Sequence, residues 1–323
     1  MIRILATLTG LAALIVAAVG LGVRHLPVSG HPTLILAAAA PYLAVAAPAA
    51  VLLLGLGRRY VLTLVAFALT VAVVWVYAPR YVASSSPEVA AVDVRVLTAN
   101  LYLGQADPAA FVAVARDAAD IVAVQELTQQ AADGLSAAGM DTAFPYRVIV
   151  PARRSSGIGL WSRHPIVHSG RIDGFTLPMV GARIRIPGVR VDATVLSVHL
   201  PGPWPTPIDG WASDIARLPD TLREVGGTAG AGAVIVAGDF NATLDMAPFR
   251  RLLDQGYDDA GADVGAGLVR TYPGSGMPPP LIGIDHILTK NASAAAATTV
   301  TVPGADHLGL LGTLRVPVDM TAG

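Results

Sequence analysis

The uneven distribution of charged residues constrains the fold of this chain more than any other feature. All 23 Asp and Glu lie at or after Glu88, and the single lysine is Lys290. The first 87 residues contain a few arginines and are otherwise mostly apolar or small. Long uncharged stretches are typical of segments in lipid, whereas the remainder has the charge of a domain in water. We therefore expect a membrane part followed by a soluble part.

Three apolar stretches in this N-terminal region have the length of membrane-spanning helices. In order, they cover residues 4–23, 33–56 and 60–77. About 20 residues at 1.5 Å per residue cross a hydrocarbon layer of roughly 30 Å. A cleaved signal peptide is the alternative for the first stretch, but two further stretches follow it. We predict a membrane domain over residues 1–80 with three transmembrane helices, for which the lipid bilayer is the partner.

The arginines next to these stretches predict their orientation. Arg3 precedes the first stretch, and Arg58 and Arg59 separate the second from the third, which favours a cytoplasmic position for both. Arg80, after the third stretch, is a mild counter-signal. We expect a multi-pass protein of the cytoplasmic membrane whose soluble domain is extracytoplasmic. Since no acidic residue or histidine lies within the stretches, they are typical of an anchor rather than of a transporter.

Beyond a predicted linker over residues 81–92, strand and helix patterns alternate. The expected strands are 94–99, 121–125, 159–161, 191–199, 233–237 and 284–288, and the expected helices are 108–118, 129–138, 211–225 and 248–254. This alternation indicates an α/β domain, which we place at residues 93–318. From residue 92 onward, 17 Lys and Arg stand against 22 Asp and Glu, and this balance of −5 disfavours a tight nucleic-acid binder. Cysteine is absent, which excludes disulfides and thiolate chemistry.

Polar side chains end one apolar strand after another. Asn100 ends the first strand, Glu126 follows the second, His199 ends a later one, and Asp239 and Asn241 follow another. Two Asp-His pairs, Asp285-His286 and Asp306-His307, lie near the C-terminus. Ligands of α/β proteins bind beyond the strand ends, so we expect these carboxylates, amides and imidazoles to share one site. His286 would point to the face opposite Asp285, which predicts a packing or supporting role.

Seven short segments resemble, in order and spacing, the motifs of the endonuclease/exonuclease/phosphatase family. They are 98–101 (TANL), 124–127 (VQEL), 157–166 (GIGLWSRHPI), 197–200 (SVHL), 238–242 (GDFNA), 284–286 (IDH) and 305–307 (ADH). That family includes DNase I-like nucleases, apurinic endonucleases, inositol-polyphosphate 5-phosphatases and neutral sphingomyelinases. The resemblance spans about residues 93–314. It implies a DNase I-like four-layer α/β sandwich, preceded here by the three transmembrane helices.

The resemblance and the chemistry of phosphoester hydrolysis together suggest roles for these residues. Glu126 and Asn100 form a hard-oxygen ligand set suited to Mg²⁺ or Mn²⁺, and Asp306 is a further metal or histidine-supporting candidate. By resemblance, Asp239 deprotonates the attacking water and Asn241 helps to hold that water or the phosphate. The choice between one metal ion and two stays open.

The histidines His199 and His307 resemble those that contact phosphate or donate a proton, with Asp285 orienting His307. Which of the two is the general acid stays open. DNase I-like nucleases pair the histidine aligned to His199 with a glutamate, yet residues 151–163 contain no acid. Trp204, in the proline-rich segment after His199, is a candidate for stacking on substrate, and a stiff surface loop is the equal alternative.

The sequence therefore predicts a divalent-metal-dependent phosphoester hydrolase (a phosphodiesterase or nuclease, or a phosphatase) acting outside the cytoplasmic membrane. Its candidate substrates are nucleic acid, a phospholipid head group or a soluble phosphoester, and no obligate protein partner is inferred. The alternative is a non-catalytic, membrane-anchored binding module that retains the fold. The complete set of ionisable residues disfavours that alternative.

Overall fold

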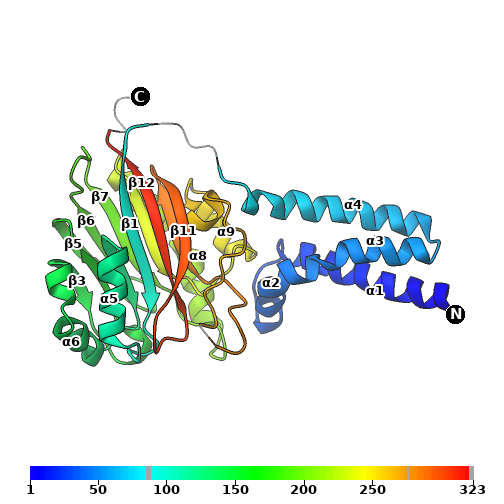
Figure 1. Cartoon of the computed structure of the whole chain (residues 1–323), viewed down its shortest axis with the longest axis horizontal. Helices are drawn as coiled ribbons and strands as arrows, with labels where there is room; N and C mark the ends of the chain where they lie inside the picture. Colours follow the sequence, from blue (N-terminus) through cyan, green and yellow to red (C-terminus); the bar gives the residue numbers. More distant parts are fainter. Residues whose placement is uncertain (85–88, 275, 320–323) are drawn as a thin grey trace.

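Two β-sheets stacked face to face form the body of the molecule, and helices cover their outer faces (Figure 1). The computed structural model describes residues 1–84, 89–274 and 276–319. Helices from the N-terminal region project from one side of this body as an elongated bundle. The two mixed sheets with helices outside them agree with the expected α/β sandwich.

The N-terminal helices are α1 (Ile2–Val23), α2 (His31–Ala44), α3 (Ala46–Leu56), α4 (Tyr60–Tyr77) and the 3₁₀ turn η1 (Ala78–Tyr81). The strands of the first sheet are β1 (Ala91–Asn100), β2 (Ile121–Gln125), β3 (Tyr146–Val150), β4 (Ile158–Ser162), β11 (Ser293–Thr301) and β12 (Leu308–Pro317). Those of the second sheet are β5 (Ile166–Ile172), β6 (Met179–Ile184), β7 (Ala193–His199), β8 (Val234–Asp239), β9 (Asp258–Asp259) and β10 (Asp285–Lys290). The remaining helices are α5 (Pro108–Ala118), α6 (Gln129–Ala137), α7 (Met140–Ala143), η2 (Arg154–Ser156), α8 (Asp209–Ala229), α9 (Ala247–Leu253) and α10 (Ala260–Asp263).

Each sheet has a parallel pair of strands next to antiparallel neighbours. The order is β11-β12-β1-β2-β4-β3 in the first sheet and β5-β6-β7-β8-β10-β9 in the second. Strands β1 and β2 run parallel, as do β7 and β8, so the carboxyl ends of each pair meet at one edge. Strand β10 is antiparallel to β8 and begins at that same edge. The carboxyl ends of β7 and β8 and the start of β10 therefore lie at the same edge of the second sheet.

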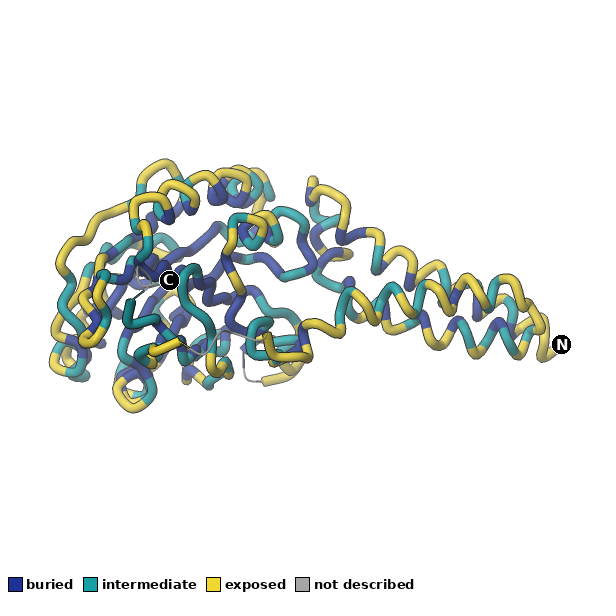
Figure 2. The backbone as a smooth tube through the Cα atoms, turned by 90° about the horizontal axis from the view of Figure 1, so that it is seen from above, coloured by how far each residue is buried: buried dark blue, intermediate teal, exposed yellow. Residues whose placement is uncertain are grey.

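Three apolar layers hold the sandwich together. The layer between the sheets contains side chains such as Val96 and Ile121 from the first sheet and Ile235 and Ile287 from the second. An outer layer packs α5 and α6 on the first sheet, and another packs α8 and α9 on the second. Figure 2 shows that buried residues are concentrated in this body. This four-layer arrangement is the one that the family resemblance implies.

Gly238 is required where β7 and β8 lie side by side. A Cβ atom at this position would lie 1.9 Å from the carbonyl oxygen of Val198. A glycine is therefore the residue that lets the two strands pair in the register that sets His199 opposite Asp239.

Several strands differ from the sequence-based expectation. The pattern predicted β1, β2, β4, β7, β8 and β10 to within a few residues, and also helices α5, α6, α8 and α9. It missed β3, β5, β6, β9, β11 and β12. Of these, β5 is mostly exposed, and β11 has an Ala- and Thr-rich sequence that lacks a clear alternation. Both are edge strands. An edge strand buries less of each side chain, and its hydrophobic period is correspondingly weak.

The second apolar stretch does not form one continuous helix. It is divided at Val45 into α2 and α3, which meet at 54°. Pro41 and Pro48 each lack an amide hydrogen, which weakens the helix on both sides of the break. By length and composition, α1 and α4 are the helices able to cross a membrane among the described residues, with a third span only if the bent pair counts as one. Three spans are therefore not confirmed, and part of the predicted linker, residues 85–88, lies outside the described residues.

Candidate active site

The predicted site residues converge at the edge of the sandwich where the parallel strands end. Asn100 ends β1, Glu126 directly follows β2, and His199 and Asp239 end β7 and β8 opposite each other. Asp285 begins β10 and is also paired with Asp239. The backbone of Glu126 turns sharply here, because its φ of 59° lies in the left-handed region that a non-glycine residue seldom adopts.

The Asn100 side chain links the two carboxylates that the sequence assigned to different roles. Its Nδ2 donates to Glu126 Oε1 at 3.2 Å and to Asp239 Oδ2 at 3.1 Å. The second oxygen of Glu126 accepts a hydrogen bond from the backbone amide of Leu103. Asn100 Oδ1 accepts from the amide of Tyr102 at 2.9 Å, which fixes the orientation of the amide group. Residues from the two sheets are thus joined through one nitrogen atom.

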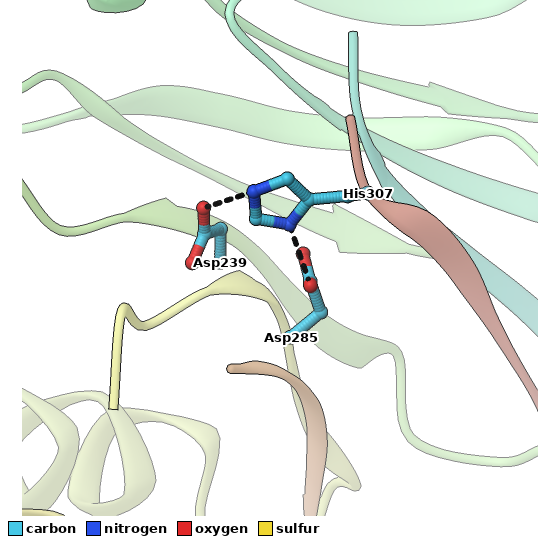
Figure 3. A group of neighbouring side chains, drawn as sticks. All are labelled: Asp239, Asp285 and His307. Carbon is cyan, nitrogen blue, oxygen red and sulfur yellow. Dashed lines mark hydrogen bonds and ion pairs between the residues drawn. The ribbon is translucent and has the colours of Figure 1, made fainter. Parts of the chain in front are cut away.

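A buried carboxylate–histidine–carboxylate group lies beside this link (Figure 3). His307 Nδ1 is 2.8 Å from Asp285 Oδ2, and its Nε2 is 3.8 Å from Asp239 Oδ2. Burial lowers the pKa of His307, but the carboxylates of Asp285 and Asp239 outweigh burial and raise it to about 10. His307 is therefore a cation at neutral pH, and its hydrogen bond with Asp285 fixes the orientation of its ring.

Asp239 occupies the centre of the site. Burial and repulsion from Asp285 raise the pKa of its carboxyl group to about 7, although His307 opposes the shift. Its Oδ1 accepts a hydrogen bond from the backbone amide of Asn241 at 2.8 Å. The Asn241 side chain donates to the carbonyl oxygen of Leu200 at 2.9 Å, which ties the loop after β8 to the loop after β7. A carboxyl group with a pKa near 7 is suited to exchanging a proton at neutral pH.

His199 is held by a backbone carbonyl where related nucleases are expected to have an acid. Its Nδ1 is 3.1 Å from the carbonyl oxygen of Ser155, and because that oxygen can only accept, Nδ1 carries the proton. Burial lowers the pKa of His199, while Glu126 opposes the shift. Its Nε2 lies 4.0 Å from Glu126 Oε1 and 3.8 Å from Asp239 Oδ2. The absence of an acid in residues 151–163 is thus compensated by Ser155.

The residues present fit a divalent cation. The Oδ1 atom of Asp285 is buried and has no hydrogen-bond partner among the described residues. Asp239, Asp285 and His307 each have one polar atom within 4.8 Å of the others, a spacing compatible with a metal ion at this place. His307 as a cation has no lone pair to offer, so the carboxylates are better ligand candidates than this histidine. Glu126, whose side chain is 14 % exposed, leaves oxygen lone pairs accessible next to Asn100.

Asp306 and Trp204 are the two remaining predicted residues. Asp306 precedes His307, is partly buried, and has a pKa raised first by burial and also by Glu126. No hydrogen bond joins its side chain to the other site residues in the described part of the chain. Trp204 is 61 % exposed, and its ring meets the ring of His31 edge to face at 4.9 Å. Trp204 therefore lies in a surface loop and is largely exposed.

His286 has the supporting role that its position in the strand predicted. Its Nδ1 is 2.7 Å from Asp259 Oδ2, its Nε2 is 2.9 Å from the carbonyl oxygen of Ala242, and its ring packs on Phe249. Burial lowers the pKa of His286, but the hydrogen bond and charge of Asp259 outweigh burial and raise it. This pair braces the loop that follows Asn241 from beneath the site.

Sequence patterns alone did not identify two features of the site. Gln125 is fully buried beneath it, accepts from Thr98 Oγ1 at 3.2 Å and donates to Ser197 Oγ at 3.3 Å, which connects the two sheets. Tyr272 places its ring 4.9 Å from that of His307. A polar residue within an otherwise apolar strand was the available signal for Gln125. Tyr272 lies in a loop without a motif, and its sequence carried no signal.

Comparisons with known proteins agree with this fold. The model of the Endonuclease/Exonuclease/phosphatase family matches residues 97–308. Among solved structures, an endonuclease/exonuclease/phosphatase from Bacteroides vulgatus is similar with a TM-score of 0.57 and 16% identity, covering 70% of this chain and 99% of that one. The 3′ phosphatase NExo from Neisseria, bound to a product DNA hairpin, has a TM-score of 0.54 and 17% identity over 68% of this chain and 98% of that one.

A third similar structure is sphingomyelinase C from Streptomyces griseocarneus, with a TM-score of 0.51, 20% identity, and coverage of 69% of this chain and 99% of that one. At these identities the solved structures show that the fold is shared. Among curated proteins, none matches this chain significantly.

Proposed function

Because the chain belongs to the endonuclease/exonuclease/phosphatase family, we propose that it is a divalent-metal-dependent phosphoester hydrolase. The observation that carries this proposal is the link from Asn100 to both Glu126 and Asp239, next to the protonated His307. A phosphoester is slow to hydrolyse because its oxygens repel the nucleophile. A site for this reaction must bring a base, a cation and a proton donor together. In this proposal Asp239 is the base, His307 is the proton donor, and Glu126 with Asn100 would hold the metal cation.

Each residue has one role in the proposed reaction. Glu126 and Asn100, with Asp306 as a further ligand candidate, would hold Mg²⁺ or Mn²⁺, which supplies charge neutralisation on the phosphate when bound. Asp239 accepts the proton of the attacking water, because its carboxyl group titrates near neutral pH. Asn241 holds the backbone next to Asp239 in place.

The two histidines differ in charge, and this difference separates their roles. His307, held as a cation by Asp285, stabilises the charge that develops on the phosphate oxygens and is the better proton donor. His199 is neutral, with its proton on Nδ1, so its Nε2 presents a lone pair toward the substrate side. In this proposal His199 accepts a hydrogen bond from the attacking water or from a protonated phosphate oxygen.

We propose a phosphoester as the substrate class and no narrower group of compounds. The similar structures carry names that refer to a DNA phosphatase and to a sphingomyelinase, and each name describes that protein. The negative balance of the soluble part disfavours tight binding to nucleic acid. A non-catalytic binding module has no need for a base and an acid with such displaced pKa values, which favours the enzyme over that alternative.

Turnover with and without metal tests this function. The full chain in detergent is expected to hydrolyse bis-p-nitrophenyl phosphate in the presence of Mg²⁺ or Mn²⁺. Removal of the metal with EDTA should lower the rate at least ~100-fold, because several kcal/mol of charge stabilisation would be lost. Adding the metal back should restore it. Equal turnover in EDTA would contradict metal dependence.

We also propose that the protein is anchored in the cytoplasmic membrane with its catalytic domain outside. Large apolar side chains are exposed on the projecting helices, for example Leu64 at 69 % and Trp75 at 81 %, and such a surface suits lipid. Arg3 lies near the N-terminus, and Arg58 and Arg59 lie in the turn between α3 and α4. Both places are at the end of the bundle far from the sandwich (Figure 1). The positive-inside tendency favours the cytoplasm for that end.

Fusion of alkaline phosphatase to the C-terminus tests this orientation, because that enzyme is active only after export. The fusion to the full chain is expected to be active in cells. A fusion placed directly after Arg59 should be inactive and serves as the internal control. The reverse result for the two fusions would overturn the proposed orientation.

A further inference from the structure

Helix α2 packs on the catalytic domain as part of its core. The apolar cluster that packs α8 and α9 on the second sheet includes Trp211 and Phe240. Three residues of α2 are buried in the same cluster, namely Leu34, Ala37 and Ala40. In Figure 1, α2 lies across the end of the helical bundle next to the sandwich. The family match begins at residue 97, so this contact joins the catalytic domain to a segment outside the matched region.

Tyr42 of α2 contacts the loop that leads into β10. Its hydroxyl donates a hydrogen bond to the carbonyl oxygen of Leu281. The guanidinium of Arg270 lies 5.7 Å from the centre of the Tyr42 ring. A small cavity of about 40 Å³ separates α2 from this loop, with Tyr42, Leu281 and Asp285 among its lining residues. Because packing is incomplete there, the hydrogen bond from Tyr42 is a specific restraint on the position of the loop.

The restraint continues to the catalytic histidine in two steps. The amide of Leu281 donates to the carbonyl oxygen of Tyr272 at 2.8 Å, and the amide of Tyr272 donates to the carbonyl oxygen of Ile282 at 2.9 Å. These bonds fix Tyr272, whose ring lies 4.9 Å from that of His307. A continuous path of contacts therefore runs from Tyr42 through Leu281 and Tyr272 to His307.

The N-terminal region holds the neighbouring loops as well. The carbonyl oxygen of Arg80, in η1, accepts from the amide of Gly267 at 2.7 Å, at the other end of the segment that contains Tyr272. His31 Nε2 lies 3.1 Å from the carbonyl oxygen of Thr206, in the loop that follows His199. Loops on two sides of the site are thus attached to the helical region.

We propose that α2 is a positioning element of the catalytic site and that Tyr42 acts through Leu281 and Tyr272 to hold His307 in place. The inference rests on the proposed function for its kinetic consequence, but its structural part stands without it. The segment that anchors the protein is, in this account, also required to assemble the site.

A double-mutant cycle tests the path. Tyr42→Phe removes only the hydroxyl and is expected to lower kcat about fivefold, the value of one hydrogen bond, with KM within about twofold. Tyr272→Leu removes the ring against His307. If Tyr42 acts through Tyr272, Tyr42→Phe has no further effect on kcat in the Tyr272→Leu background. Tyr60→Phe, at an exposed tyrosine of α4, is the matched control and should behave as the wild type.

Two kinetic results would overturn the proposal. One is an unchanged kcat in Tyr42→Phe. The other is a double variant whose loss of kcat equals the product of the losses in Tyr42→Phe and Tyr272→Leu. Such independent effects indicate that Tyr42 does not act through Tyr272.

Hydrogen exchange gives a second readout that needs no turnover. In the full chain, Tyr42→Phe should speed amide exchange in residues 276–284 at least about threefold over the wild type and Tyr60→Phe, because the loop loses its restraint. Equal exchange in all three proteins would refute the positioning role. If no phosphoester is hydrolysed by the wild type, the proposed function fails, while this exchange result still decides whether α2 holds the loop.

Discussion

Two ionisable residues of the site, Asp239 and His307, have pKa values displaced in ways that suit opposite tasks. The carboxyl of Asp239 has a pKa of about 7, and it acts as a base only when deprotonated. The imidazole of His307 has a pKa of about 10, and it stabilises anionic oxygens only when protonated. Between these two values both residues are in the forms that the proposed reaction requires.

The rate of hydrolysis is therefore expected to depend on pH with two limbs. The rate should rise as pH passes about 7, where Asp239 loses its proton, and fall as pH passes about 10, where His307 loses its own. Asp285→Asn removes the carboxylate that contributes most to raising the pKa of His307, so the upper limb should move to lower pH. Kinetics of both proteins from pH 5 to about 11 check this. An unmoved upper limb would contradict the role of Asp285.

At this scale, the sequence predicted the reactive residues better than their partners. Glu126, Asp239 and His307 stand in motifs at strand ends, and the structure brings them together. Ser155 supports His199 through its carbonyl oxygen, which every residue type possesses, so no sequence pattern marks it. Tyr272 was not predicted for a related reason, because a ring contact made by a loop residue leaves no periodic pattern in the sequence.

Among the elements, the helical region and the catalytic domain are joined by a buried ionic contact. Asp245, in the loop between Asn241 and α9, accepts from Arg80 with both oxygens at 3.0 Å and forms an ion pair with Arg24. Tyr77 of α4 donates to the same carboxylate at 3.1 Å. Residues that follow α1 and α4 therefore meet at a single acid of the catalytic domain.

Asp245→Asn should destabilise the protein strongly. It leaves the buried guanidinium groups of Arg24 and Arg80 without a carboxylate, a change that costs about 3 kcal/mol or more. Thermal unfolding of the full chain in detergent should show a midpoint lowered by several degrees, whereas Asp117→Asn, in an exposed ion pair, should leave it nearly unchanged. Equal midpoints for the two variants would show that this contact does not hold the regions together.

The break between α2 and α3 shows what an apolar pattern leaves undetermined. Residues 33–56 are apolar enough to cross a membrane, but an apolar helix can equally be buried against a protein core. Helix α2 is buried against a protein core, because Leu34 and Ala37 pack with residues of the catalytic domain. Hydropathy alone does not distinguish the two environments, because it records the residue type and not the neighbour.

At the scale of the whole molecule, the sandwich could be predicted and the attachment of the helices could not. Seven motifs in order fixed the family and with it the layers of the catalytic domain. The contacts of Tyr42 with Leu281 and of Arg24 with Asp245 join residues more than 200 positions apart, and neither belongs to a motif. Such contacts follow from tertiary packing, which a single sequence does not reveal.

The central claim is that Glu126 and Asp239 belong to one hydrolytic site, and kcat of their isosteric variants tests it most directly. Asp239→Asn should lower kcat for bis-p-nitrophenyl phosphate about 10²- to 10⁴-fold, and Glu126→Gln about 100-fold, with the thermal midpoint retained. Glu224→Gln and Asp220→Asn, both exposed on α8, are the matched controls and should retain the wild-type rate. Wild-type turnover in Asp239→Asn or Glu126→Gln would contradict the account.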